Sequence, residues 1–232
     1  MKKIGFIGAY DKTDLILNIA KILTMFNKQV LVVDSTICQK AKYIVPAINP
    51  TKTYITEFEK IDVAIGFYDE EEIMKYLAIS DEKKIEYDIM LVDTDNVEGY
   101  KNFKLDEAFK KYFVTSFDNY SLKKGLETLS GLQDVTSLTK VLFEKDIIKE
   151  EEDYLDFLAS NYKIAWKEEK FYFPIENGDL SAIYENQRVG KIKFKKLSAQ
   201  YKDGITYISE QILEDEKESA IRREIRKIEK GE

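Results

Sequence analysis

A lysine and a threonine, Lys12 and Thr13, lie between a short apolar segment, Lys3–Ala9, and a segment with helical periodicity. In a phosphate loop, GxxxxGK followed by Ser or Thr, the lysine reaches the phosphates and the hydroxyl binds Mg²⁺. Lys12 and Thr13 are therefore candidate nucleotide-binding residues, and Thr13 is a candidate Mg²⁺ ligand. An ordinary surface lysine is the alternative for Lys12.

Two carboxylates end apolar, strand-like segments, because Asp34 closes Gln29–Asp34 and Asp93 closes Tyr87–Asp93. Near-continuous apolar runs of this kind are typical of parallel strands that are covered on both faces. Carboxylates can hold Mg²⁺ and orient a water for phosphoryl transfer. Ligands of parallel sheets bind beyond the carboxyl ends of the strands, where we expect Gly8, Asp34 and Asp93 to lie. A loop cap at the end of a strand is the alternative for Asp93.

The rest of the chain alternates between strand-like and helix-like patterns. Leu15, Ile19, Ile22 and Phe26 repeat at helical spacing. Further strands are predicted at Tyr112–Phe117, Thr139–Phe143 and Phe171–Pro174, and helices at Glu70–Ala78, Ser121–Leu132, Glu151–Ser160 and Ser219–Lys230. Such alternation predicts an α/β fold with a doubly wound, mostly parallel sheet and helices on both faces.

The amino-acid composition limits the ligands and reactions that this protein can have. Hydrophobic residues make up 44% of the 232 residues, enough for a sizeable core, and the formal net charge is −7. This negative charge disfavours nonspecific binding to nucleic acid or to anionic membranes. The chain has no histidine and one cysteine, Cys38, which removes imidazole chemistry and intramolecular disulfides. The apolar run near Met1 is too short for a signal peptide and no later run reaches a spanning length, so a cytoplasmic protein is expected.

In the order of its motifs, the chain resembles the ParA/MinD family of deviant Walker ATPases. DKTDLILNIA resembles the family's GKTTLALNLA, VLVVDST its VLLIDAD, and YDIMLVDTD its Walker B strand. YFVTSFDNYSLKKGLETL resembles the next strand and helix, and IENGDLSAIYENQ with KKLSAQYKDGITYISEQIL resembles the adenine-side loop and final helices. The resemblance implies one P-loop NTPase-type domain at 1–213 and a charged helical tail at 214–232.

The resemblance also implies a set of site residues. The nucleotide positions would be Gly8, Lys12, Thr13, Asp34, Asp93 and Pro174, with Thr13 and Asp93 serving Mg²⁺ only if nucleotide binds. The family's loop GKGGxGK(S/T) corresponds to FIGAYDKT, Phe6–Thr13, so most of its glycines are replaced. Glycines allow the backbone to turn its N–H groups toward a phosphate. The lysine that relatives send across a dimer corresponds to Ile7, and the acid linked to hydrolysis corresponds to Thr36.

Asp11 replaces a loop glycine directly ahead of Lys12. A carboxylate about 4 Å from a phosphate oxygen is repelled by about 4 kcal/mol at a surface-like dielectric, which corresponds to about a thousandfold in affinity. An aspartate ahead of a helix also caps free N–H groups. Both interpretations predict weakened anion binding, and no catalytic residue is predicted.

Three functions are compatible with these residues. The favoured one is a pseudo-ATPase scaffold that positions or recruits a larger assembly, such as partition, division, pilus or secretion machinery, as family members do. The first alternative is a working dimeric switch that binds ATP and Mg²⁺. The second is a DNA-binding partition module that uses the basic segment Arg188–Lys202, for which a solvated helix entry is the plainer interpretation.

A protein partner and a homodimer are expected under the favoured function. Membrane docking by the last predicted helix is disfavoured, because its stripe of Ala220, Ile221, Ile225 and Ile228 lacks the Phe, Trp and Leu of interfacial helices.

Overall fold

The computed structural model describes residues 1–47, 51–79, 86–144, 149–174 and 176–230. Its strands are β1 (Lys2–Ile7), β2 (Val30–Asp34), β3 (Tyr54–Phe58), β4 (Ile61–Ile65), β5 (Ile89–Thr94), β6 (Lys110–Ser116), β7 (Thr136–Glu144) and β8 (Ile164–Pro174). Its α-helices are α1 (Thr13–Met25), α2 (Glu70–Ile79), α3 (Val97–Asn102), α4 (Asn119–Ser130), α5 (Lys149–Ala159), α6 (Asn177–Val189), α7 (Ala199–Leu213) and α8 (Glu218–Lys230). Two short 3₁₀ helices lie at Lys40–Tyr43, after β2, and at Leu105–Glu107, after α3.

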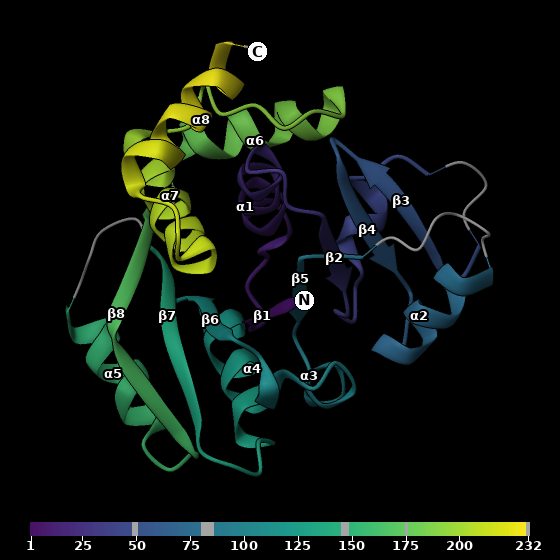
Figure 1. Cartoon of the computed structure of the whole chain (residues 1–232). Helices are drawn as coiled ribbons and strands as arrows, with labels where there is room; N and C mark the ends of the chain where they lie inside the picture. The colour runs from purple at the N-terminus through teal and green to yellow at the C-terminus, as the bar shows by residue number, and fades with distance from the viewer. Residues whose placement is uncertain (48–50, 80–85, 145–148, 175, 231–232) are drawn as a thin grey trace.

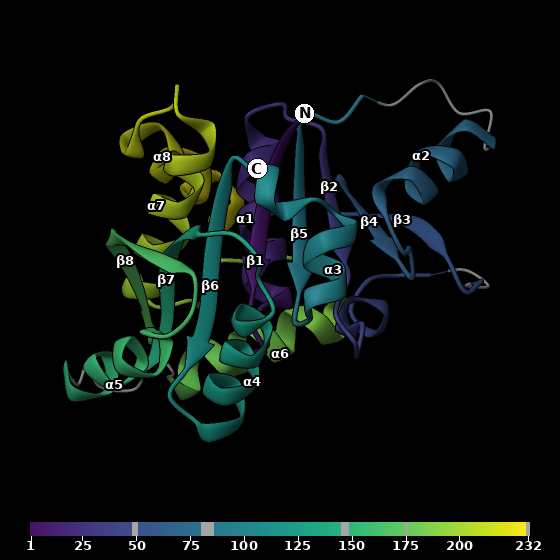
Figure 2. The same ribbon diagram turned by 90° about the horizontal axis from the view of Figure 1, so that it is seen from below.

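The eight strands form one sheet in the order β3-β4-β2-β5-β1-β6-β7-β8. All neighbouring pairs are parallel except β3 and β4, which are antiparallel. Figure 2 shows β1 in the middle of the sheet, between β5 and β6. The doubly wound, mostly parallel α/β fold predicted from the sequence is therefore confirmed.

The edge hairpin of β3 and β4 was not predicted. The turn between these strands is Glu59–Lys60, and both residues have positive φ, at 56° and 70°. A tight hairpin turn needs positive φ at both central residues, and Asn-Gly or Asp-Gly is its usual signature. Because this turn uses Glu and Lys, its sequence gave no hairpin signal.

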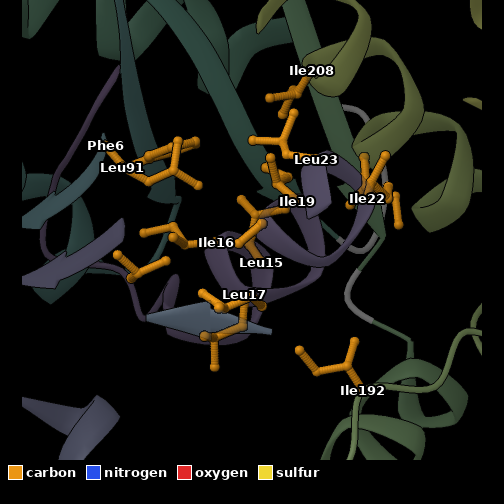
Figure 3. Packing of buried hydrophobic residues seen from close by; sticks show 14 of the residues in the cluster. Phe6, Leu15, Ile16, Leu17, Ile19, Ile22, Leu23, Leu91, Ile192 and Ile208 are labelled. Atoms are coloured by element: carbon orange, nitrogen blue, oxygen red, sulfur yellow. The ribbon is translucent and has the colours of Figure 1, made fainter. Parts of the chain in front are cut away.

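Helices cover both faces of the sheet and bury two separate cores (Figure 1). The first face carries α1, α6, α7 and α8, and the second carries α2, α3, α4 and α5. Helix α1 is apolar on most sides because it lies between the sheet and α7. Figure 3 shows Ile19, Leu23 and Ile208 within this first-face core.

The C-terminal helix α8 is packed against the domain. Ile221 and Ile225, from the predicted apolar stripe, are buried in the first-face core. Arg222 adds an ion pair at 2.6 Å to Asp203 of α7. The stripe therefore faces protein and not solvent. Residues 231–232 of the predicted tail lie outside the described residues.

No helix in the described part of the chain combines the length and the apolar character needed to cross a bilayer.

Candidate functional site

The connection from β1 to α1 is short. Only the four residues Gly8–Asp11 lie between the end of β1 at Ile7 and Lys12, the N-cap of α1. The phosphate-loop motif places six residues, GxxxxG, ahead of its lysine, and here these are Phe6–Asp11, of which Phe6 and Ile7 belong to β1. The amide of Gly8 also donates to the carbonyl of Thr94 at 3.0 Å, which extends the contact between β1 and β5 and leaves less free loop.

The backbone conformation at position 8 requires a glycine. Its φ is +136°, and a Cβ built there would lie 2.1 Å from the carbonyl oxygen of Val114 on the neighbouring strand β6. A larger residue would clash with backbone at a φ that L-residues avoid. Gly8 therefore keeps the turn tight against the sheet.

Lys12 is directed into the protein. It is 3% exposed, its Nζ lies 2.7 Å from Oδ1 of Asp93, and it donates to the carbonyl of Gly8 at 2.6 Å. Burial, opposed by Lys12 and reinforced by nearby Asp34, raises the pKa of Asp93 to about 7. When Asp93 is ionised, its carboxylate and the ammonium of Lys12 neutralise each other in the interior at the carboxyl end of the sheet.

Asp34 stands directly beside Asp93 in the parallel register of β2 and β5. Its Oδ1 accepts hydrogen bonds from the amide and the hydroxyl of Thr36, at 3.1 and 2.6 Å, and its Oδ2 accepts one from the amide of Ala41 at 2.9 Å. Both oxygens of Asp34 therefore hold the chain that leaves β2.

Asp11 contacts a second cation, Lys40, which the sequence did not indicate. Its Oδ1 accepts a 3.3 Å hydrogen bond from the amide of Thr13, in agreement with a capping role, and its Oδ2 forms an ion pair with Lys40. Lys40 also lies 3.7 Å from Asp14 of α1, which accepts a 2.7 Å hydrogen bond from Gln187 of α6. Lys40 is thus shared by the two carboxylates at the start of α1, and Gln187 adds a neutral hydrogen bond to Asp14.

Burial raises the pKa of Asp14 to about 6, and Asp11 adds to that shift while Lys40 and Gln187 oppose it. A carboxyl that is this close to a helix start and this well buried disfavours a further negative charge nearby.

Pro174 and the start of α1 line one cavity of about 180 Å³. Its other walls are largely aromatic and aliphatic, and it is lined by Tyr10, Asp11, Asp14, Leu15, Lys40, Phe143, Pro174, Asp179, Leu180, Ile183, Tyr184 and Tyr201. Tyr10 stacks on Phe143 with ring centroids 4.6 Å apart. Burial, with Asp11 nearby, raises the pKa of Tyr10 to about 12.

The structure thus brings Gly8, Lys12, Asp34 and Asp93 to one edge of the sheet, and it places Pro174 on the wall of the adjoining cavity. Thr13 is the first residue of α1 and is buried. Lys40 and Gln187 were missed, because their partners lie far away in the sequence and no spacing pattern connects them. In the described part of the chain, no group of three or more His, Cys, Asp or Glu side chains is arranged to hold a metal ion.

Comparison with known proteins relates the fold to solved structures. No family model matches the chain, and no curated protein matches it. A ParA family ATPase from Chlorobium tepidum aligns with a TM-score of 0.60 and 14% identity over 90% of this chain and 97% of its own. MinD in a MinC–MinD cell division complex from Aquifex aeolicus aligns with a TM-score of 0.58 and 16% identity over 94% and 97%. The pNOB8 ParA bound to nonspecific DNA aligns with a TM-score of 0.57 and 14% identity over 93% and 99%. The chain therefore has the fold of the ParA/MinD ATPases.

Proposed function

We propose that this chain is a ParA/MinD-like protein that acts without ATP hydrolysis, as a scaffold that positions or recruits a larger assembly. The observation that carries the proposal is the ion pair of Lys12 with Asp93, whose side chains are 2% and 4% exposed. The cation that a triphosphate would need is already neutralised inside the protein.

Nucleotide binding at Lys12 would break this pair. Leaving one charge of a buried ion pair without its partner costs about 3–5 kcal/mol. The bound phosphates would also approach the carboxylate of Asp11, and Gly8 is the one glycine among the six residues Phe6–Asp11 ahead of Lys12. These residues do not fit ATP and Mg²⁺ in the manner of a phosphate loop, so no catalytic step is assigned to them.

Protein partners follow from the same proposal. One solved structure with this fold is MinD in complex with MinC. A partner that binds the folded surface does not require this chain to bind and hydrolyse ATP. A homodimer and a cytoplasmic location belong to the proposal as well.

The proposal is tested by isothermal titration of the full chain with ATP and Mg²⁺. We expect no binding tighter than about 1 mM. The test includes Lys12→Met and, as a matched control, Lys28→Met at an exposed lysine. Micromolar ATP affinity that is lost in Lys12→Met and kept in Lys28→Met would refute the scaffold without nucleotide.

A working ATP switch is the second candidate, because Lys12, Asp34 and Asp93 still meet at the carboxyl edge of the sheet. This candidate predicts micromolar ATP affinity in the same titration, lost in Lys12→Met and kept in Lys28→Met. DNA binding through Arg188–Lys202 has less support, since Lys196 and Lys202 of this segment are paired with Glu185 and Glu229, at 2.5 and 2.9 Å.

A further inference from the structure

At the carboxyl end of β2, the connections that follow neighbouring strands run to opposite faces of the sheet. The chain leaving β2 passes to the first face, where Ala41 is buried in the first-face core. The chains leaving β4 and β5, which flank β2, pass to the second face, where Phe67 and Tyr100 are buried. A crevice forms where adjacent strands send their connections to opposite faces of a parallel sheet, and such crevices bind ligands.

A cavity of about 420 Å³ lies at this crevice. It is lined by Ser35, Thr36, Gln39, Lys52, Thr53, Gly66, Phe67, Tyr68, Glu72, Asn96, Glu98, Gly99 and Asn102. Its volume falls in the range of small-molecule sites, about 300–1,000 Å³. None of these residues lines the cavity beside Tyr10 and Pro174, so the two sites are separate.

Several polar groups of this cavity are already used by the fold. Asn96 accepts from the amide of Gly99 at 2.7 Å and donates to the carbonyl of Ser35 at 3.0 Å. The hydroxyl of Thr36 donates to Asp34, and Glu72 accepts from the amide of Tyr68 at 2.7 Å. These bonds hold the walls of the cavity in place before any ligand arrives.

Several other polar side chains of the lining are not used in this way, and four of them carry a charge or a carboxamide. Among the described residues, the side chains of Gln39, Lys52, Glu98 and Asn102 have neither a hydrogen bond nor an ion pair. The set contains one cation, one anion and two carboxamides, which both donate and accept hydrogen bonds.

The two unpaired charges belong to opposite sides of β2. The backbone of Lys52 packs against Gly66 at the end of β4, where a Cβ on the glycine would lie 2.2 Å from the carbonyl oxygen of Lys52. Glu98 lies in the first turn of α3, which follows β5. Because β4 and β5 flank β2, Lys52 and Glu98 join the cavity lining from opposite sides of this strand.

We propose that this cavity binds a small zwitterion of the amino-acid class, a free amino acid or a short peptide, with its carboxylate toward Lys52 and its ammonium toward Glu98. The carboxamides of Gln39 and Asn102 bind its remaining polar groups.

Other ligand classes fit this lining less well. A phosphate or another anion would meet the carboxylates of Glu72 and Glu98 against the single cation Lys52. An uncharged polyol would take both Lys52 and Glu98 partly out of water without giving either an opposite charge. A zwitterion supplies both counter-charges at once.

The experiment is a two-dimensional amide NMR titration of the isotope-labelled full chain with each of the twenty amino acids and with glycylglycine, at millimolar concentrations. Glucose, inositol and inorganic phosphate form the comparison arms. We expect saturable shifts at residues 35–39, 66–68 and 96–102 with at least one amino acid or with the dipeptide, and none with the comparison compounds.

Four single variants localise the binding. Lys52→Ala and Glu98→Ala remove exposed side chains of the lining, and each should weaken the ligand at least about tenfold. Lys195→Ala and Glu150→Ala, at exposed positions elsewhere, should leave affinity unchanged. The proposal is wrong if no zwitterion shifts these amides, if Lys52→Ala and Glu98→Ala bind it as the parent does, or if glucose or phosphate binds equally well. ATP binding at Lys12 would not affect this result, so the two proposals fail independently.

Discussion

Nζ of Lys12 lies 2.7 Å from Oδ1 of Asp93, and both side chains are almost fully buried at the carboxyl end of the central strands. The same lysine donates to the carbonyl of Gly8. One side chain thus ties together the loop after β1, the start of α1 and the end of β5. This arrangement makes Lys12 part of the structure of the domain, whatever ligand the domain binds.

Lys12→Met should destabilise the fold by about 3–5 kcal/mol at pH 8, because it leaves Asp93 buried and without its counter-charge. The cost should be smaller at pH 6, below the raised pKa of about 7 of Asp93, where the carboxyl is protonated more readily. The free energy of unfolding in urea measures both.

Two comparisons show whether the pair itself is responsible. The double variant Lys12→Met with Asp93→Asn removes both charges and should recover most of the loss. Lys28→Met, at an exposed lysine, should change stability by less than about 0.5 kcal/mol. A Lys12→Met protein as stable as its parent at pH 8 would show that the pair contributes nothing.

Asp14 should make stability depend on pH. Its folded-state pKa is raised from 3.8 to about 6, so the folded protein binds the proton more tightly than the unfolded chain. The contribution is fully present below about pH 4 and is lost as pH rises through about 6. The stability of the parent relative to Asp14→Asn should therefore fall by about 2 kcal/mol between pH 4 and pH 7.

Urea unfolding at several pH values gives this difference. Asp134→Asn, at an exposed carboxylate, is the control and should follow the parent within about 0.5 kcal/mol. A difference between parent and Asp14→Asn that stays flat, or that rises with pH, would contradict the burial of Asp14 as the cause.

Gly8→Ala should destabilise the domain by about 3 kcal/mol or more, because the new Cβ would lie 2.1 Å from the carbonyl oxygen of Val114 at a φ of +136°. Gly178→Ala is the matched control, since nothing lies within 4 Å of its built Cβ and it belongs to α6. That change should be neutral or stabilising by up to about 1 kcal/mol. Thermal unfolding of both variants is the measurement, and equal effects at the two glycines would be inconsistent with the tight turn.

Ile221→Ala should cost about 2–5 kcal/mol, because this side chain of α8 is fully buried in the first-face core. Ile37→Ala, at a side chain that is 70% exposed, should cost less than about 0.5 kcal/mol. Since the stripe of α8 is covered, the parent should also not co-float with anionic lipid vesicles. Flotation of the parent, or a harmless Ile221→Ala, would mean that α8 leaves the domain.

Local pattern was enough to predict the parallel core of this fold. The apolar runs that end at Asp34 and Asp93, and the helical spacing from Leu15 to Phe26, are signals that neighbouring residues carry among themselves. They could be predicted because burial on both faces of a sheet requires continuous apolar strands. The edge hairpin could not, because the Glu59–Lys60 turn is imposed by the pairing of β3 with β4 and has no favourable residue of its own.

The sequence by itself determined that a lysine, a glycine and two carboxylates would gather at one edge of the sheet, since parallel strands bring their carboxyl ends together. Only the tertiary structure decided how they pair: Lys12 with Asp93, Asp34 with the chain that follows β2, and Asp11 with Lys40. The cavity between Lys52 and Glu98 is likewise a product of strand order, which places β2 between β4 and β5. Contacts between residues far apart in the chain depend on which strands become neighbours, and no spacing within a segment encodes that choice.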